Sequence, residues 1–529
     1  MMWNQYAQVG TRGLPIRPWR SGAVAVLWCA LVLAPQTHRA QTPHTSALPQ
    51  LGDGEVMSLA AERRLGDQIV RDLYRDPDYL DDPLLSDYLQ AVWAPLLAAA
   101  VERGEVPAEL RTQLAWELLV SRDRRVNAFA LPGGYLGVHL GLLAVTQTPD
   151  ELASVLAHEL SHVSQRHIAR MVTRQNQQAP WMIGAMILAA LAANASKNTD
   201  VVGAAMAGGQ AVAAHSQLGF SRDMEREADR VGLSVMRDAG FAPAGFVGMF
   251  ERLQQASRLN DDGAFPYLRS HPLTTERIAD MRARLALEPA PADAAAPVSA
   301  LWHRLMAERA RVLAERNPDN WQTWWRHGQQ SQATALERYT AALAAWRLGR
   351  HTDALDLAQR LATEPSWRND PAMQQVLLHW RMELWLAQPA AQRRASADLL
   401  LWREAGLRSP ARAGRLLAAQ VALHTGAGAA AESTLRSWVV DHPRDAAAWQ
   451  LLSQVHDAQG HALRARRAQA EARVAQGDWS GAAEVLRAAQ ALPKAVQDSD
   501  TLEQAIIHSR LREVRERLRE VMRDEAAAR

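Results

Sequence analysis

The chain has 529 residues, more than one ordinary hydrophobic core requires, so we expect two or three domains. Its 59 lysines and arginines nearly balance its 57 aspartates and glutamates, and a net charge of +2 argues against a dedicated binder of nucleic acid or another polyanion. Hydrophobic residues make up 48% of the chain and charged residues 22%, a composition typical of soluble globular proteins.

Residues 1–40 have the pattern of a cleaved export signal. An arginine-containing start precedes the apolar run 22–34, which is too short to span a membrane, and a polar stretch follows up to Ala40, where we expect cleavage. The only cysteine, Cys29, lies within this segment, so the mature chain contains none, as suits an oxidising compartment. We therefore expect a periplasmic protein.

The next segment, 41–287, is expected to form a first domain that is mainly helical. Apolar residues recur at helical spacing in 48–74 and again in 81–100. Between them and the next helix, two short apolar stretches flank "PGG" at residues 132–134, which predicts a tight β-hairpin. The domain should therefore be α-rich with a small hairpin or sheet.

A helix should begin after Thr148, because "TPDE" has the form of a capping box with proline at the first helical position. Further along it, His158 and His162 stand four residues apart and project from one helical face, where both imidazoles can meet one ion. Glu159 stands beside the first of them, where it could take a proton from the attacking water. "HELSH" thus matches the HExxH pattern of zinc peptidases.

A catalytic zinc needs a third protein ligand, and a second helix offers one. In "FSRDMEREADRVGLSVM", Glu225 and Asp229 are again four residues apart and share a face. Glu225 would bind the metal, while Asp229 would accept the free ring N–H of a ligand histidine and fix its tautomer. The alternative is that this helix merely shows solvated charges, as we expect for Asp223 and Glu227.

The runs "NAFALPGGYLGVHLGLL", "HELSH", "EREAD" and "HPLTTERIADM" together resemble the gluzincin metallopeptidases related to the CAAX-processing protease and HtpX. The resemblance implies one Zn²⁺ per chain, with the metal ligands His158, His162 and Glu225 and the general base Glu159. It also implies that Arg277 stabilises the tetrahedral intermediate and that His271 can approach the zinc and hold the enzyme latent. The alternative for His271 is a simple helix-entry residue before Pro272.

Asn127 and Phe129, on the first strand of the hairpin, could hold an extended substrate by backbone pairing, since an edge strand lines the cleft in this family. Three other histidines lie near the motifs without the required helical spacing. These are His139, His167 and His215, and we expect ordinary polar roles for them. The apolar runs within 181–214 are each about 14 residues, or roughly 20 Å of helix, too short to span a bilayer. We expect core or lid packing, with peripheral membrane contact as the alternative.

Residues 288–299 are rich in proline and alanine and predict a linker. Beyond it, 300–529 should be entirely helical. A turn glycine followed five residues later by alanine recurs there, and the distance from Gly426 to Gly460 is the tetratricopeptide period. We expect degenerate tetratricopeptide-like repeats that present a surface to partner proteins, with an irregular helical bundle as the alternative. The stripe on the last helix, which runs to Met522, indicates a capping helix.

These features predict a periplasmic zinc metalloendopeptidase joined to a helical-repeat platform. Resemblance to periplasmic members of the family with such a tail implies unfolded or misassembled outer-membrane β-barrel proteins as substrates and the barrel-assembly machinery as partner. One alternative is a chaperone or scaffold whose repeats do the work while the zinc site stays latent. Another, a membrane-embedded protease, is disfavoured because we expect no apolar span of 18 residues.

Overall fold

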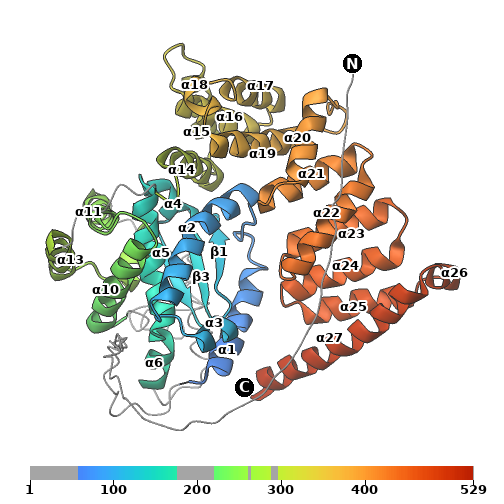
Figure 1. Ribbon diagram of the computed structural model, residues 1–529, viewed down its shortest axis with the longest axis horizontal. Helices are drawn as coiled ribbons and strands as arrows, with labels where there is room; N and C mark the ends of the chain where they lie inside the picture. The colour runs from blue at the N-terminus through green and yellow to red at the C-terminus, as the bar shows by residue number, and fades with distance from the viewer. Residues whose placement is uncertain (1–56, 175–219, 260–263, 288–295, 528–529) are drawn as a thin grey trace, which may run out of the picture. The chain divides into compact units, whose positions relative to one another are not determined.

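The computed structural model describes residues 57–174, 220–259, 264–287 and 296–527 (Figure 1). The expected export signal, the apolar runs of 181–214 and most of the expected linker lie outside these residues. The described part consists of helices and one small sheet. This confirms the expected mainly helical fold class.

The first half of the chain forms a layer of helices around the sheet. Its helices are α1 (Leu59–Leu73), α2 (Pro83–Glu102), α3 (Ala108–Gln113), α4 (Leu140–Val145), α5 (Pro149–Ser164), α6 (His167–Arg174), α10 (Arg222–Asp238), α11 (Ala244–Leu259), α12 (Pro266–Ser270) and α13 (Thr275–Leu287). Side chains close several of their first turns, because Ser58, Asp82 and Ser221 each accept a backbone N–H at the start of α1, α2 and α10. Helix α5 packs between α10, α11, α2 and the sheet, so it is the centre of this half.

The sheet has three strands, β1 (Glu117–Ser121), β2 (Ala128–Leu131) and β3 (Tyr135–His139), in the order β1-β3-β2. Strands β2 and β3 form the expected antiparallel hairpin. Gly133 and Gly134 make its turn at φ of 78° and 84°, a region that favours glycine. The hairpin prediction is therefore confirmed. Strand β1 pairs in parallel with β3 and was not expected, because its partner lies some 18 residues along the chain.

Helix α2 corrects the expectation that no 18-residue apolar span exists. Its 20 residues are long and apolar enough to cross a membrane by length and composition, and it is the one such helix in the described ranges. In the fold it is a core helix, with Leu85, Tyr88 and Val92 fully buried. It packs against α5 and α10 on one side and against helices of the second half on the other.

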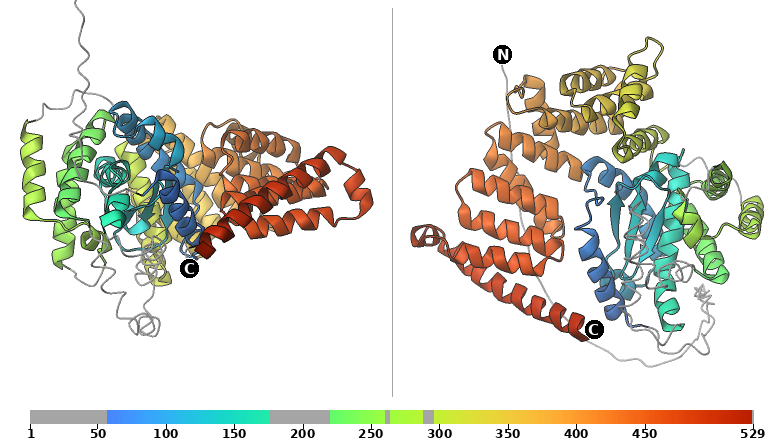
Figure 2. Two further views of the ribbon diagram at one scale, coloured as in Figure 1. Left: turned by 90° about the horizontal axis from the view of Figure 1, so that it is seen from below. Right: turned by 180° about the vertical axis from the view of Figure 1, so that it is seen from behind.

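The second half is entirely helical, as expected. Its helices are α14 (Ala300–Ala314), α15 (Pro318–Gly328), α16 (Ala335–Arg347), α17 (His351–Leu361), α18 (Pro365–Arg368), α19 (Pro371–Ala387), α20 (Ala397–Leu407), α21 (Arg412–His424), α22 (Gly428–Asp441), α23 (Ala446–Ala458), α24 (Ala462–Ala475), α25 (Trp479–Gln490), α26 (Lys494–Asp498) and α27 (Thr501–Ala527). Figure 1 and the right-hand view of Figure 2 show α21 to α25 stacked as successive neighbours. The turn glycines Gly349, Gly426, Gly460 and Gly477 all have φ between 71° and 79°, which explains why each pair of helices breaks at a glycine.

The last helix closes this stack. Helix α27 packs along α25, and its Leu511 and Val514 are buried. Met522, which the expected stripe included, is 60% exposed. The buried face of the helix therefore ends before its last turns.

The two halves are joined by buried charged contacts. The carboxylate of Asp87 in α2 accepts the backbone N–H groups of Arg412 and Ala413 at 3.1 and 3.0 Å, so it caps helix α21 across the joint. Arg309 of α14 is fully buried and forms a fork with Asp82, the N-cap of α2. Helix α2 of the first half therefore also holds α14 and α21 of the second half in place.

Candidate metal centre

Helix α5 begins at Pro149, as expected, with Thr148 as its N-cap. The Thr148 hydroxyl accepts the N–H of Glu151 at 3.2 Å. The Glu151 carboxylate accepts the N–H of Gln147 at 2.7 Å, one residue before the position that a capping box predicts. Every residue of α5 except Asp150 is buried. The functional side chains of this helix therefore project into the interior.

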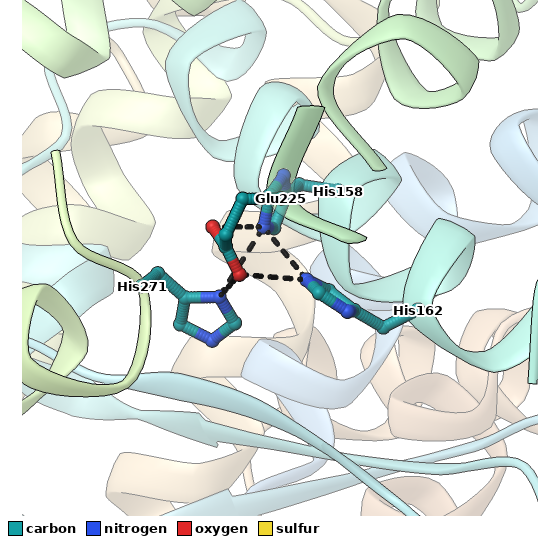
Figure 3. A group of neighbouring side chains, drawn as sticks. All are labelled: His158, His162, Glu225 and His271. Atoms are coloured by element: carbon teal, nitrogen blue, oxygen red, sulfur yellow. Dashed lines mark hydrogen bonds and ion pairs between the residues drawn. The ribbon is translucent and has the colours of Figure 1, made fainter. Parts of the chain in front are cut away.

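Four side chains converge on one point (Figure 3). His158 and His162 come from α5, Glu225 from α10, and His271 follows α12 directly. The distances between donor atoms are 2.9 Å for Nε2 of His158 and Nε2 of His162, 3.3 Å for His158 Nε2 and His271 Nδ1, 3.0 Å for His271 Nδ1 and Glu225 Oε1, and 3.4 Å for Glu225 Oε1 and His162 Nε2. All four residues are at most 1% exposed. Donors at about 2.0–2.1 Å around one tetrahedral ion lie about 3.3 Å apart, so this donor set fits a zinc ion.

Helix α10 brings its carboxylates to the histidines by lying close to α5. A Cβ atom at Gly232 would lie 3.1 Å from the backbone of Ala157 and His158, so glycine permits this approach. Glu225 and Asp229 are both 1% exposed and face α5, as their spacing predicts. Asp229 Oδ1 lies 2.9 Å from His158 Nδ1. This contact orients the ring so that its Nε2 faces the other donors.

Arg277 lies behind the carboxylates. Its guanidinium donates through Nε and Nη2 to the two oxygens of Asp229, each at 2.7 Å. Nη1 lies 2.7 Å from Glu225 Oε2 and donates to the carbonyl of Pro272 at 2.9 Å. The side chain is buried, and its polar contacts are to Asp229, Glu225 and the carbonyl of Pro272.

His271 lies between the donor cluster and Glu159. Its Nδ1 faces Glu225, whereas its Nε2 lies 3.4 Å from Glu159 Oε1. The ring of Tyr267 stacks on it with a centroid distance of 4.6 Å. The other oxygen of Glu159 accepts the N–H of Ala130 in β2 at 2.9 Å, which ties the carboxylate to the sheet.

His167, for which we expected an ordinary polar role, contacts the donor cluster. Its Nδ1 lies 2.8 Å from Nδ1 of His162, and its Nε2 lies 3.0 Å from Glu227, which Arg170 also contacts at 3.0 Å. His167 therefore supports a residue of the donor cluster, and Glu227 is not merely a solvated charge. Helical spacing could not reveal this, because Arg166 has φ of 54° and breaks the helix between the two histidines.

Two other histidines near the motifs have different surroundings. His139 is buried in β3, with Nδ1 3.7 Å from Asp123, and burial lowers its pKa to about 4. His215 lies outside the described residues. His139 is thus a neutral strand histidine away from the donor cluster.

Buried carboxylates and imidazoles shift one another's pKa values within the donor cluster. Burial opposes the charged form of Glu225, but the ring of His271 and hydrogen bonds from the other imidazoles hold its pKa well below the usual range. Burial also opposes protonation of His158, yet hydrogen bonds to Asp229 and Glu225 outweigh it and raise its pKa to about 10. At His162 burial dominates and lowers the pKa. The carboxylates supply the negative charge that a divalent cation requires.

Successive backbone groups of β2 point alternately toward β3 and toward the opposite edge, where Glu159 lies. The carbonyl of Asn127 accepts the N–H of His139, and Phe129 stands opposite Gly137 in the same ladder. The N–H of Ala130 points the other way, to Glu159. The outward backbone positions on this edge are therefore those of Ala128 and Ala130, whereas the backbone groups of Asn127 and Phe129 face β3.

Comparison with known proteins agrees with this geometry. Residues 91–285 match the model of peptidase family M48, a range that includes all four donor side chains and Glu159. The match thus covers the sheet and the helices that position the candidate centre.

Several curated proteins are similar to the chain. It is 33% identical over 262 residues to the putative beta-barrel assembly-enhancing protease of Vibrio cholerae, covering 49% of this chain and 51% of that protein. It is 31% identical over 274 residues to the beta-barrel assembly-enhancing protease of Escherichia coli, covering 51% and 53%. It is 28% identical over 202 residues to the mitochondrial metalloendopeptidase OMA1 of Saccharomyces cerevisiae, covering 37% and 55%. The matches thus span about half the length of these relatives.

Proposed function

We propose that the chain, whose residues 91–285 match the model of peptidase family M48, is a periplasmic zinc metalloendopeptidase acting in assembly and quality control of outer-membrane β-barrel proteins. The observation that carries the proposal is the convergence of four buried donors (Figure 3), with Glu159 3.4 Å from one of them. Two imidazoles and a carboxylate are a donor set that suits the borderline character of Zn²⁺. When bound, zinc would polarise the scissile carbonyl and the attacking water.

Glu159 is the residue we assign to proton transfer. Its Oε2 is held by the N–H of Ala130, and its Oε1 lacks a hydrogen bond within the described ranges. Oε1 is therefore the oxygen that would take the proton of the attacking water and later deliver it to the leaving amine. His158, His162 and Glu225 would hold the ion, with Asp229 orienting the His158 ring.

The edge of β2 would align the substrate. An extended peptide that pairs with the outward groups of Ala128 and the carbonyl of Ala130 would run directly past Glu159, which the N–H of Ala130 holds. Asn127 and Phe129 would then act indirectly, because their backbone groups pair with β3 and hold β2 in position. Such pairing recognises the peptide backbone rather than particular side chains, which suits a protease whose substrates are unfolded chains.

The clients and partners are proposed from the relatives' names. Two similar proteins are named beta-barrel assembly-enhancing proteases, which supports misassembled outer-membrane proteins as substrates and the barrel-assembly machinery as partner. The paired helices of 300–529, which we propose to be tetratricopeptide-like repeats, would form the partner platform beside a peptidase domain of 41–287. The membrane contact considered for 181–214 concerns residues outside the described part.

Replacing the general base tests the proposal. Purified Glu159→Gln protein should bind zinc at the parent stoichiometry yet lose at least 10²-fold in casein cleavage and autolysis, because the proton acceptor is gone. Glu276→Gln is the matched control, since this glutamate is exposed at the rim of the cavity beside Glu225. Cleavage by Glu159→Gln at the parent rate would refute the mechanism.

A second candidate function is a chaperone whose zinc site is latent, and the position of His271 favours it. The imidazole of His271 is the fourth donor of the cluster and takes the place that a catalytic site keeps open. The cavity that reaches Glu225 measures about 170 Å³, below the roughly 300–1,000 Å³ typical of ligand sites. We therefore propose that His271 holds the resting enzyme latent and that it must leave before a peptide enters.

Two experiments separate the candidates. His271→Ala should raise casein cleavage several-fold over the parent, and the double variant with Glu159→Gln should remain inactive, which excludes a contaminating protease. An unchanged rate in His271→Ala would remove the latency proposal. In a deletion strain, full restoration of outer-membrane protein assembly by Glu159→Gln would show that chaperoning dominates over proteolysis.

A further inference from the structure

A second group of metal-ligating side chains lies among the repeats, far along the chain from the peptidase centre. It consists of Glu432 in α22, His456 near the end of α23 and His461 just before α24. One donor atom from each lies within 4.8 Å of both others. The turn at Gly460 brings the two histidines together, with ring centroids 6.0 Å apart.

His456 has a polar atom that the fold leaves without a partner. The residue is 2% exposed, and its Nδ1 has no hydrogen-bond partner among the residues that the structure describes. The same is true of Oε1 of Gln459, which lies between the two histidines in sequence. A buried polar atom without a partner costs about 1–3 kcal/mol, so the fold leaves the buried ring of His456 with a nitrogen that a ligand can use.

The charges around the group leave its donors available. Burial lowers the pKa of His456 to about 4, so its ring is neutral and able to ligate at neutral pH. Arg436 lies 3.7 Å from Glu432, but its side chain is mostly exposed, so it can turn into solvent when Glu432 binds a cation. Two further arginines lie nearby, and each has an acidic partner. Arg464 pairs with Asp500 at 2.8 Å, and Arg467 pairs with Glu503. Their positive charges are thus partly compensated.

We propose that Glu432, His456 and His461 bind a second borderline divalent cation, with Zn²⁺ as the expected ion. Two imidazoles and one carboxylate are the donor types that suit this class of metal. Donors about 2.0–2.1 Å from one ion lie at most about 4.2 Å apart. The exposed side chain of His461 can rotate to close the remaining distance. A solvent-facing position beside His461 would be filled by water.

The ion would join neighbouring units of the repeat stack. Glu432 belongs to one helix pair, whereas His456 and His461 belong to the next. In a stack where each unit contacts only its neighbours, one cross-link fixes the angle between two units. Metal binding would therefore stiffen the platform without requiring the peptidase centre, and the proposal does not depend on proteolysis.

Metal content of the full chain tests the proposal. Untagged parent protein, equilibrated with Zn²⁺ and freed of loosely bound metal by gel filtration, should carry two zinc ions per chain. His461→Ala and Glu432→Gln should each carry one, and both substitutions are at solvent-accessible positions that should not unfold the chain. His508→Ala, an exposed histidine on α27, should retain two.

The location of the second ion is tested by hydrogen exchange. Zinc should protect backbone amides within 428–475 in the parent and fail to do so in His461→Ala, while casein cleavage by the two proteins stays equal. A single zinc ion in the parent would overturn the proposal. So would a second zinc ion that persists in both His461→Ala and Glu432→Gln, because it would have to bind elsewhere.

Discussion

Arg277 holds Asp229 through two parallel hydrogen bonds of 2.7 Å, and Asp229 in turn contacts the ring of His158 at 2.9 Å. The same guanidinium contacts Glu225 and the carbonyl of Pro272, next to His271. Arg277 thus contacts the donor Glu225 directly, and it contacts residues next to two further donors: Asp229 beside His158, and Pro272 beside His271. In this state it is positioned to orient the metal ligands, whereas the sequence resemblance implies a role in stabilising the tetrahedral intermediate.

Replacing Arg277 with lysine distinguishes the two roles. Lysine keeps the charge but cannot form the planar fork to Asp229. If the residue orients ligands, zinc affinity should fall about 10–100-fold in Arg277→Lys, and kcat of the zinc-saturated enzyme should change little. Competition with a chromophoric chelator measures the affinity. A fall in kcat with unchanged zinc affinity would instead assign the residue to the transition state.

Removing the whole side chain should also destabilise the fold. Arg277→Ala leaves Asp229 and Glu225 buried without their cation, which typically costs about 3–5 kcal/mol. The apparent Tm of Arg277→Ala should therefore lie well below that of Arg277→Lys when both are measured without zinc. Equal melting temperatures would mean that the buried carboxylates do not depend on this pair.

A further prediction concerns His167, which lies against one of the donor histidines. Its ring contacts Nδ1 of His162 at 2.8 Å and is itself held by Glu227. His167→Ala frees the ring of His162 to turn, so zinc affinity should fall about 10-fold or more. His139→Asn is the control, because it alters a buried histidine that does not contact the donor cluster. Unchanged affinity in His167→Ala would show that packing alone orients His162.

The part of the site that lies on regular helices could be predicted from spacing. His158 with His162, and Glu225 with Asp229, follow from a repeat of four residues on one helical face. The contact to His167 could not be predicted, because the positive φ of Arg166 interrupts the helix. Regular spacing therefore predicts a site only as far as the helix continues.

Contacts made through long side chains or between distant segments were also beyond prediction. The spacing of residues around Arg277 contains no sign that its guanidinium turns toward Asp229. The pairing of β1 with β3 is equally non-local, and nothing in "ELLVS" specifies a parallel partner. Helix α2 looks like a membrane span by composition, and only its packing shows that it is a core helix. Local pattern thus predicted elements, whereas tertiary packing determined their partners.

One carboxyl group at the joint between the two halves, that of Asp87, has a raised pKa. Asp87 caps α21 through two backbone N–H groups and lies near Arg412 and Asp445. Burial outweighs these hydrogen bonds and the nearby cation, and raises the pKa of Asp87 to about 6. In the unfolded chain the same group titrates near 3.9. Between these pH values the folded chain therefore retains a proton that the unfolded chain has lost.

Stability from Asp87 should therefore be fully present below about pH 4 and be lost as the pH rises through about 6. Asparagine does not titrate, so the apparent Tm of the parent minus that of Asp87→Asn should fall between pH 4 and pH 7. The full change corresponds to at most about 3 kcal/mol, or a few degrees for a chain of this size. Asp441→Asn, at an exposed aspartate ending α22, should show a constant difference. A difference for Asp87→Asn that stays flat or rises with pH would mean that the hydrogen bonds to α21 outweigh burial, and that the ionised cap stabilises the joint.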